Sequence, residues 1–319
     1  MTLRKTLLTV VTLPCLFWTL AGGQSGPAII DASGVKGGLV VCVNFTDANI
    51  LASLQVDNRY LVQGLSTDMQ IVEQARRTIA ALGKYGPVSV DRYSGGVLPY
   101  DDNMVDLVVS DNLGSVTMTE VNRVLSPRGV AYIAGNKTVK PYPAEMDEWT
   151  HHLHSPDNNA VSRDLVAGPP RYLRFMAEPK TARDHEHLAT MSESVTGNGR
   201  IFSIVDKASA SNLRWPAQWY LVARDAFNGK FLWEKPISKW ASVLRKFKLG
   251  PTDLHHRMAV QGDTLYATLG LTAPVVKINA PPLLEKSNCL SVYNVAVSAD
   301  WVKLCSMNQT TDDALVAFR

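Results

Sequence analysis

The sequence lacks an excess of charge of either sign, and this absence argues against two kinds of partner. Its 319 residues include 32 lysines and arginines against 29 aspartates and glutamates, a net charge of +3. A protein that binds nucleic acid or an anionic membrane through its overall charge needs a larger basic excess. We therefore expect no nucleic-acid partner. The 46% of hydrophobic residues is ordinary for a globular protein, and the length suffices for two domains.

Long apolar runs are lacking too, except at the amino terminus. Leu7–Leu20 is apolar and uncharged, follows Arg4 and Lys5, and precedes a short stretch of small residues. This pattern predicts a signal peptide over residues 1–23, since the run is shorter than the about 20 residues that span a membrane. We expect a mature chain that begins near Gln24, has no membrane span, and is soluble in the periplasm or outside the cell.

Cysteine is scarce, and its spacing excludes a cysteine-based metal site. Four cysteines are present, of which Cys15 falls within the predicted signal peptide. Cys289 and Cys305 could pair in an oxidising compartment. Cys42 lies in an apolar run and is expected to be a small buried hydrophobic residue.

Strand-like and helix-like segments alternate between residues 37 and 135. Continuous apolar runs predict buried strands, whereas apolar residues three and four positions apart predict helices. Strands alternating with helices indicate parallel pairing and a doubly wound α/β sheet, which we assign to a domain over residues 24–142. The expected strands are Leu39–Val43, Tyr60–Leu65, Val88–Val90, Met104–Val109 and Gly129–Ile133, and the expected helices are Ala48–Leu54, Met69–Leu82 and Thr119–Leu125.

The pattern changes after a proline-containing linker near residue 142. Helical periodicity gives way to short β-branched and aromatic runs separated by glycine-containing turns, which is typical of an antiparallel sandwich or a propeller. We assign residues 143–319 to an all-β domain. The expected strands are Arg200–Val205, Trp219–Arg224, Lys230–Lys235, Arg257–Gln261 and Thr264–Leu269.

Glycine is missing where a nucleotide-binding domain of this kind would need it. The loop after the first strand, Cys42–Asn49, contains none. A backbone that approaches a cofactor closely needs residues without a Cβ atom, which also tolerate positive φ. Of the residues that replace glycine there, only Asn44 adopts such a conformation readily.

Two downstream stretches carry a family resemblance. Leu98-Pro-Tyr-Asp-Asp-Asn-Met-Val-Asp106-Leu-Val and Glu120-Val-Asn-Arg-Val-Leu-Ser-Pro-Arg-Gly129 resemble segments of class I S-adenosylmethionine-dependent methyltransferases, and the resemblance spans residues 37–135. It implies a Rossmann-like fold with S-adenosylmethionine at the carboxyl ends of the strands. The cofactor-binding positions that it implies are Asn44, Asp47, Ser66, Asp68 and Asp91. The chain departs from the family pattern in the loop and at Ser66, where the family has an acid, and a serine lacks the bidentate grip of a carboxylate.

The second half resembles the quinoprotein-like β-propellers. The segment Trp219–Trp233 is similar to the repeat of that family: a strand, a turn closed by Asp225 and Gly229, and a strand ending in tryptophan. An Asp side chain can bond the amides of such a turn while Gly takes positive φ. A second repeat begins at Arg257, and we find only these two, too few for a closed ring of at least about four blades. The resemblance therefore implies an incomplete propeller that does not bind pyrroloquinoline quinone.

All seven histidines fall between residues 151 and 256. On extended strands, alternate side chains share a face. His152 with His154, and His185 with His187, could thus supply four nitrogen ligands to zinc or copper. The alternative is that these histidines are polar loop residues.

Together these patterns favour an exported, non-catalytic protein without a bound cofactor. Its α/β domain would serve as a scaffold, and its propeller-like region would bind a protein or a small molecule. One alternative is an active S-adenosylmethionine-dependent methyltransferase with a non-standard loop. A second alternative is a quinoprotein-type oxidoreductase.

Overall fold

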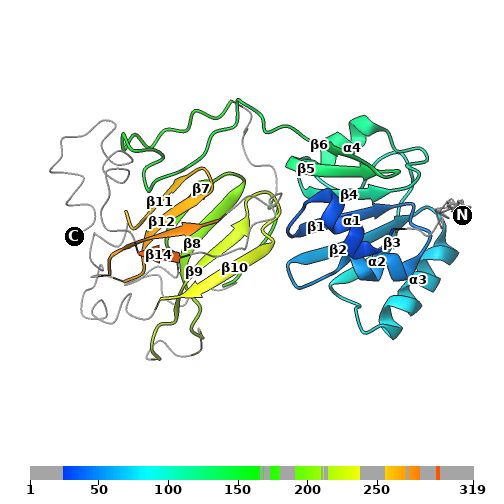
Figure 1. Ribbon diagram of the computed structural model, residues 1–319, viewed down its shortest axis with the longest axis horizontal. Helices are drawn as coiled ribbons and strands as arrows, with labels where there is room; N and C mark the ends of the chain where they lie inside the picture. Colours follow the sequence, from blue (N-terminus) through cyan, green and yellow to red (C-terminus); the bar gives the residue numbers. More distant parts are fainter. Residues whose placement is uncertain are drawn as a thin grey trace, which may run out of the picture.

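The computed structural model describes residues 24–165, 168, 173–179, 191–209, 211, 215–237, 256–270, 273–280 and 292–294. They form two domains that lie next to each other along the long axis of the molecule (Figure 1). The α/β domain comes first in the chain, and the β-rich domain follows a long linker. No helix within the described ranges is long and apolar enough to cross a membrane. The predicted signal peptide, Cys289 and Cys305 lie outside the described residues.

A six-stranded sheet forms the α/β domain, in the order β3-β2-β1-β4-β5-β6. Strands β1 to β5 pair in parallel, whereas β6 returns from β5 as an antiparallel hairpin. The order reverses between β1 and β4, which makes this a doubly wound, Rossmann-like sheet as predicted. The strands are β1 (Gly38–Val43), β2 (Tyr60–Ser66), β3 (Val88–Arg92), β4 (Val105–Ser110), β5 (Leu125–Ile133) and β6 (Asn136–Val139).

Helices cover both faces of this sheet. Helices α1 (Gly26–Ser33), α2 (Ala48–Leu54) and α3 (Met69–Ala81) pack into one apolar cluster, and α4 (Met118–Val124) packs into a second cluster on the other face. Because both faces are covered, β1 and β4 are buried along their whole length, which explains the apolar sequence of β1 and the mostly apolar sequence of β4. Cys42 lies within β1, where burial raises the pKa of its thiol to about 12, as expected for a buried structural cysteine.

The β-rich domain contains two four-stranded antiparallel sheets that share one apolar core. Each sheet follows the order of the chain, so neighbouring strands are joined directly. One sheet comprises β7 (Met191–Gly197), β8 (Arg200–Asp206), β9 (Trp219–Asp225) and β10 (Phe231–Pro236); the other comprises β11 (Met258–Gln261), β12 (Thr264–Thr268), β13 (Val275–Asn279) and β14 (Val292–Asn294). Blades of propellers have this four-stranded form. A propeller nevertheless stays a prediction, because two such sheets do not make a ring.

The two sheets approach each other closely at β7 and β11. A Cβ atom on Gly197 would lie 2.2 Å from Cγ1 of Val260, so only glycine fits there. The linker joins the sheets as well: the amide of Thr196 donates to the carbonyl of Trp149 (2.7 Å), and the amide of Val260 donates to the carbonyl of Thr150 (3.0 Å). The linker is therefore hydrogen-bonded to one strand of each sheet, β7 and β11.

Candidate functional site

The reversal of strand order places a candidate ligand crevice at the carboxyl ends of β1 and β4. Asn44, the first residue after β1, lies across this edge. Its Nδ2 donates to the carbonyl of Asn112 (3.2 Å), and its Oδ1 accepts from the hydroxyl of Tyr93 (2.9 Å). The Asn44 amide thereby connects the end of β1 with the residues that follow both β3 and β4. A ligand at this point would have to displace these contacts.

The backbone of Asn44 keeps the conformation that a glycine would have. Its φ is 53°, in the left-handed region, as expected for the one residue of the loop that substitutes for glycine readily. Gly114 also has positive φ (60°), and a Cβ atom there would lie 2.9 Å from Nδ2 of Asn44. The loop after β1 thus has a glycine-like turn whose side chain occupies the space above it.

Phe45 points away from the crevice and into the core. It is 7% exposed and belongs to the apolar cluster that contains Leu51 and Leu54 of α2. A Cβ atom on Gly64 would lie 3.0 Å from the Phe45 ring, so the ring packs directly on β2. The side chain that lies at the carboxyl ends of the strands is therefore that of Asn44, whereas Phe45 belongs to the core.

Two of the predicted cofactor carboxylates serve as helix caps. Asp47 accepts from the amide of Asn49 (2.7 Å) at the start of α2, and Asp68 accepts from the amide of Gln70 (2.8 Å) at the start of α3. Side-chain oxygens at this position satisfy amides that have no partner inside the helix. Both carboxylates thus have structural hydrogen bonds without any ligand.

Replacement of Asp68 by alanine is expected to lower the free energy of unfolding by about 1 kcal/mol, the usual value for a lost helix cap. Asp68→Asn is the matched control, because asparagine caps about as well as aspartate. Urea denaturation of both variants tests this role. If the two variants lost equal stability, helix capping would not be the way in which Asp68 stabilises the protein.

The remaining predicted positions are also engaged. Asp91 forms an ion pair with Arg76 (2.7 Å) and accepts from Nε2 of Gln63 (2.8 Å). Ser66 is buried at the end of β2, and its hydroxyl accepts from the amide of Asp68 (3.1 Å). The structure therefore gathers Asn44, Ser66 and Asp68 near the same sheet edge but directs Asp91 toward α3.

Tyr93 and Asn112 were not predicted as partners of Asn44. Tyr93 is the first residue after β3. Asn112 belongs to a polar pair directly after the apolar fourth strand. Polar residues directly after buried strands were the signal for this group, because the carboxyl ends of parallel strands meet at one edge.

The histidine prediction was wrong in its local structure. Residues 151–154 form a tight turn rather than an extended strand: the amide of His151 donates to the carbonyl of His154 (3.2 Å), and His154 has a φ of 71°. Nε2 of His154 lies 2.6 Å from Oδ2 of Asp147, whereas the His152 ring contacts that of His256 at 4.6 Å between centroids. The two histidines therefore do not share a strand face.

His185 and His187 lie outside the described residues, so the four-histidine site as a whole stays a prediction. Within the described ranges, no three His, Cys, Asp or Glu side chains are grouped as a metal site requires.

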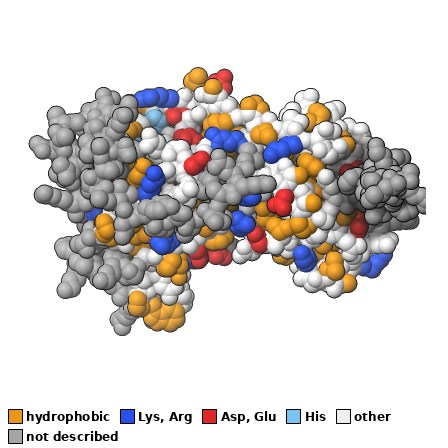
Figure 2. All heavy atoms as spheres, viewed as in Figure 1, with side chains coloured by type: hydrophobic (Ala, Val, Ile, Leu, Met, Phe, Trp, Pro, Cys, Tyr) orange, Lys and Arg blue, Asp and Glu red, His pale blue; other side chains and the backbone are white. Residues whose placement is uncertain are grey.

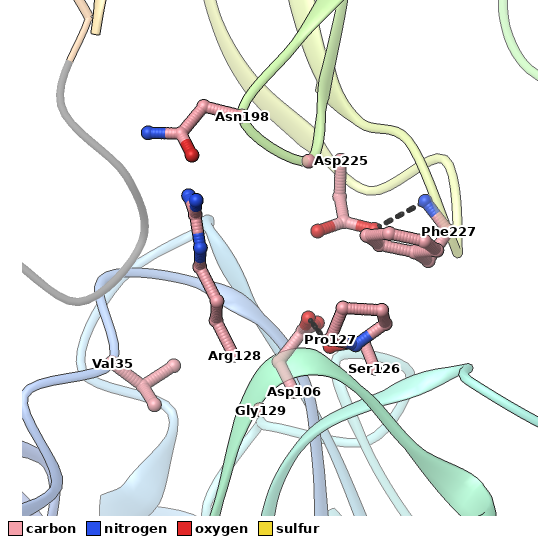
Figure 3. A pocket seen from close by; sticks show the side chains of 10 residues that line it. Val35, Asp106, Ser126, Pro127, Arg128, Gly129, Asn198, Asp225 and Phe227 are labelled. Carbon is pink, nitrogen blue, oxygen red and sulfur yellow. Dashed lines mark hydrogen bonds between the residues drawn. The ribbon is translucent and has the colours of Figure 1, made fainter. Parts of the chain in front are cut away.

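A second candidate region lies where the two domains meet. A cavity there is lined by Asp106, Ser126 and Arg128 of the α/β domain and by Asn198 and Asp225 of the β-rich domain (Figure 3). Asp106 and Asp225 face each other across it, 2% and 1% exposed. Burial raises the pKa of Asp106 well above its ordinary value and raises that of Asp225 to about 6. Two carboxyl groups are thus enclosed at this junction.

Arg128 and Asn198 also line a larger cleft of about 580 Å³ beside this cavity. The linker supplies most of its wall, including Tyr142, His154 and Arg163. The guanidinium of Arg128 stacks on the Tyr142 ring, 4.8 Å from its centroid. On the face of the molecule in Figure 2, acidic and basic side chains are interspersed without a large patch of one sign. The cleft is large enough for a small ligand.

Comparison with solved structures finds proteins similar to about a third of this chain. One is a candidate S-adenosyl-L-methionine-dependent methyltransferase from Methanococcus maripaludis, 21% identical, with a TM-score of 0.31 over 35% of this chain and 55% of that chain. A SAM-dependent methyltransferase from Aquifex aeolicus is 21% identical, with a TM-score of 0.31 over 33% and 61%. Geranyl diphosphate C-methyltransferase from Streptomyces coelicolor A3(2) is 15% identical, with a TM-score of 0.31 over 33% and 42%.

The chain spans about half the length of these solved structures. No protein-family model and no curated protein matches the sequence. The class of the molecule therefore rests on its own strand order and site: a doubly wound, Rossmann-like α/β domain joined to a β-rich domain of two antiparallel sheets.

Proposed function

We propose that this protein is a non-catalytic, two-domain binding protein whose α/β domain is a methyltransferase-like scaffold. One observation carries the proposal. The Asn44 amide lies across the crevice at the switch point and uses both of its polar atoms, on Asn112 and Tyr93. S-adenosylmethionine does not fit these residues, because its binding would break both contacts and find no glycine in the loop.

The engaged carboxylates support the same conclusion. Asp47 and Asp68 cap helices, and Asp91 pairs with Arg76. A ribose would have to compete with a backbone amide or a guanidinium for each of these groups, and Ser66 in place of an acid offers a weaker contact. We therefore derive no methyl-transfer step for this chain.

The linker, together with Arg128 of the α/β domain and Asn198 of the β-rich domain, supplies the binding surface in this proposal. The cleft beside Arg128 and Asn198 offers a concave wall with charged, aromatic and amide groups for a small molecule or a protein segment. Export to the periplasm or beyond remains part of the proposal, resting on the apolar Leu7–Leu20 run. A quinone-dependent oxidoreductase would need a complete ring of blades, of which the described residues supply two four-stranded sheets.

Isothermal titration calorimetry with S-adenosylmethionine tests the scaffold proposal. We expect no measurable heat of binding at ligand concentrations up to about 1 mM, a limit that corresponds to only about 4 kcal/mol of affinity. Asn44→Gly is the informative variant. The φ of Asn44 suits glycine, so this substitution removes both crevice contacts without straining the backbone.

Micromolar binding by the unmodified protein that disappears in Asp47→Ala would favour the alternative of an active methyltransferase with a non-standard loop. Weak binding that arises only in Asn44→Gly would instead support the proposal, because it would show that this amide closes an inherited crevice. A methyltransferase known to bind the cofactor, titrated in parallel, serves as the positive control.

A further inference from the structure

A turn of the β-rich domain docks on the α/β domain through specific hydrogen bonds. The turn after β9 is shaped by Asp225, whose Oδ1 accepts from the amides of Phe227 (2.8 Å) and Asn228 (2.9 Å). Nδ2 of Asn228 then donates across the junction to Oδ2 of Asp106 (2.6 Å) and to the carbonyl of Met104 (3.1 Å). The contact is therefore directional, and it lies at the start of β4, opposite the crevice closed by Asn44.

Asp106 is held in place from its own domain as well. Its Oδ2 accepts from the amide of Leu39 in β1 (2.7 Å), and its Oδ1 accepts from the hydroxyl of Ser126 in β5 (3.0 Å). A Cβ atom on Gly38 would lie 1.9 Å from Oδ2, so the backbone passes directly beside the carboxyl group. Asp106 cannot turn away from Asp225 without losing these bonds.

The two carboxyl groups are almost fully buried and face each other across the cavity between the domains. Two carboxylates that face each other away from water repel strongly when both are charged, so we infer that one of the pair holds a proton. After burial, the charge of Asp225 is the next cause that raises the pKa of Asp106. A shared proton therefore takes the place of a cation at this point of the junction.

The charged groups of the surrounding elements have other partners. Arg128 of β5 stacks on Tyr142, and Figure 3 shows its guanidinium directed toward Asn198. Before β2, Asp57 pairs with Arg59 (2.7 Å) and also attracts Lys230 of the β9–β10 turn. Arg224 of β9 donates to the carbonyl of Gly229 (3.2 Å). These neighbours supply no ion pair that would keep both carboxylates charged.

We propose that the proton shared by Asp106 and Asp225 is a pH-sensitive latch between the two domains, closed in acid and released as the pH rises. Loss of the proton leaves two negative charges facing each other on almost fully buried side chains, and separation of the domains restores their hydration. The inference goes beyond the proposed binding function, and it holds whether or not the crevice at Asn44 takes a ligand.

The direction of the pH dependence follows from proton linkage. In the docked form the pKa of Asp225 is raised to about 6, and burial also raises the pKa of Asp106 well above its ordinary value. Separated carboxyl groups titrate near about 4, so the docked form holds more protons above that pH. Docking is therefore fully stabilised below about pH 4 and weakens as the pH rises through about 6 and beyond.

Hydrogen exchange of the Leu39 amide tests the latch, because this amide donates to Asp106 at the junction. The protection factor, corrected for the intrinsic effect of pH on exchange, would be measured at about pH 5 and about pH 8. We expect it to fall at least about tenfold in the unmodified protein, as the release of one proton over this range allows. Small-angle X-ray scattering should show a larger radius of gyration at the higher pH.

Asp225→Asn is the deciding variant. Its amide keeps the Oδ1 acceptor of the turn and supplies a permanent donor to Asp106, so protection should change less than about twofold with pH. Asp68→Asn makes the same chemical change at a helix cap on the opposite edge of the sheet and should keep the full pH dependence. Equal pH dependence in Asp225→Asn and the unmodified protein would overturn the latch.

Circular dichroism establishes that each variant is folded. If Asp225→Asn does not fold, the unmodified protein decides the question by itself. A Leu39 protection factor and a radius of gyration that stay constant between about pH 5 and about pH 8 would overturn the proposal.

Discussion

Replacement of Asp106 by alanine is expected to lower the free energy of unfolding by about 1–3 kcal/mol, the cost of leaving buried hydrogen-bond donors without their acceptor. The side chain receives hydrogen bonds from Leu39, Ser126 and Asn228, and it is 2% exposed. Alanine would leave these donors without an acceptor in a place that excludes water. Urea denaturation at about pH 6, followed by circular dichroism, measures the loss.

Asp102→Ala is the matched control in the same domain. Asp102 also bears a hydrogen-bonded carboxylate, in an ion pair with Arg123 (2.8 Å), but its side chain is 66% exposed. Such a surface pair contributes less than about 1 kcal/mol. Equal losses in the two variants would mean that the burial of Asp106 does not determine its contribution.

The role of Asp106 shows what the sequence predicts and what it does not. Its neighbours Val105 and Leu107–Val109 are a continuous apolar run, and this run predicts a buried strand because local spacing reflects burial. The partner of Asp106 is Asn228, 122 positions further along the chain. Nothing in the local pattern of either residue indicates that the other one lies nearby.

Elements with strong local patterns were predicted well. The helix from Met69 and the strand from Trp219 agree with α3 and β9 within a residue or two. Strand β7 was missed, since Met-Ser-Glu-Ser-Val-Thr-Gly has few apolar residues and obtains its burial from β11 instead. Helix α1 was also missed, because its eight residues are too short to show a clear helical period.

The candidate cofactor site stays a prediction, and the sequence did not indicate the contacts that its residues make. The glycine-free loop follows β1 at the switch point, and the positive φ of Asn44 agrees with its glycine-like position. That Asp47 and Asp68 cap helices follows from their place directly before α2 and α3. The family resemblance instead gives Asp47 and Asp68 a role in cofactor binding. Only their three-dimensional contacts distinguish that role from helix capping.

Replacement of Phe45 by alanine should lower the free energy of unfolding by about 3–5 kcal/mol, as for other buried aromatic residues. The ring lies between β2 and α2, against Gly64 and Leu51, and has no close access to the crevice. The truncation would leave a cavity among apolar side chains, which the short backbone segment between β1 and α2 cannot close. Urea denaturation measures the loss.

Tyr85→Ala is the matched control, because Tyr85 is an aromatic residue of the same domain that is 63% exposed. This substitution should change the free energy of unfolding by no more than about 0.5 kcal/mol. The Phe45→Ala variant also distinguishes a role of Phe45 in the core from a role in closing the crevice. The Asn44 amide remains in place in this variant, so S-adenosylmethionine should still not bind. A stable Phe45→Ala variant that gains cofactor binding would mean that Phe45, rather than Asn44, closes the crevice. Destabilisation without binding would place the closure at Asn44 and leave the aromatic ring as part of the scaffold.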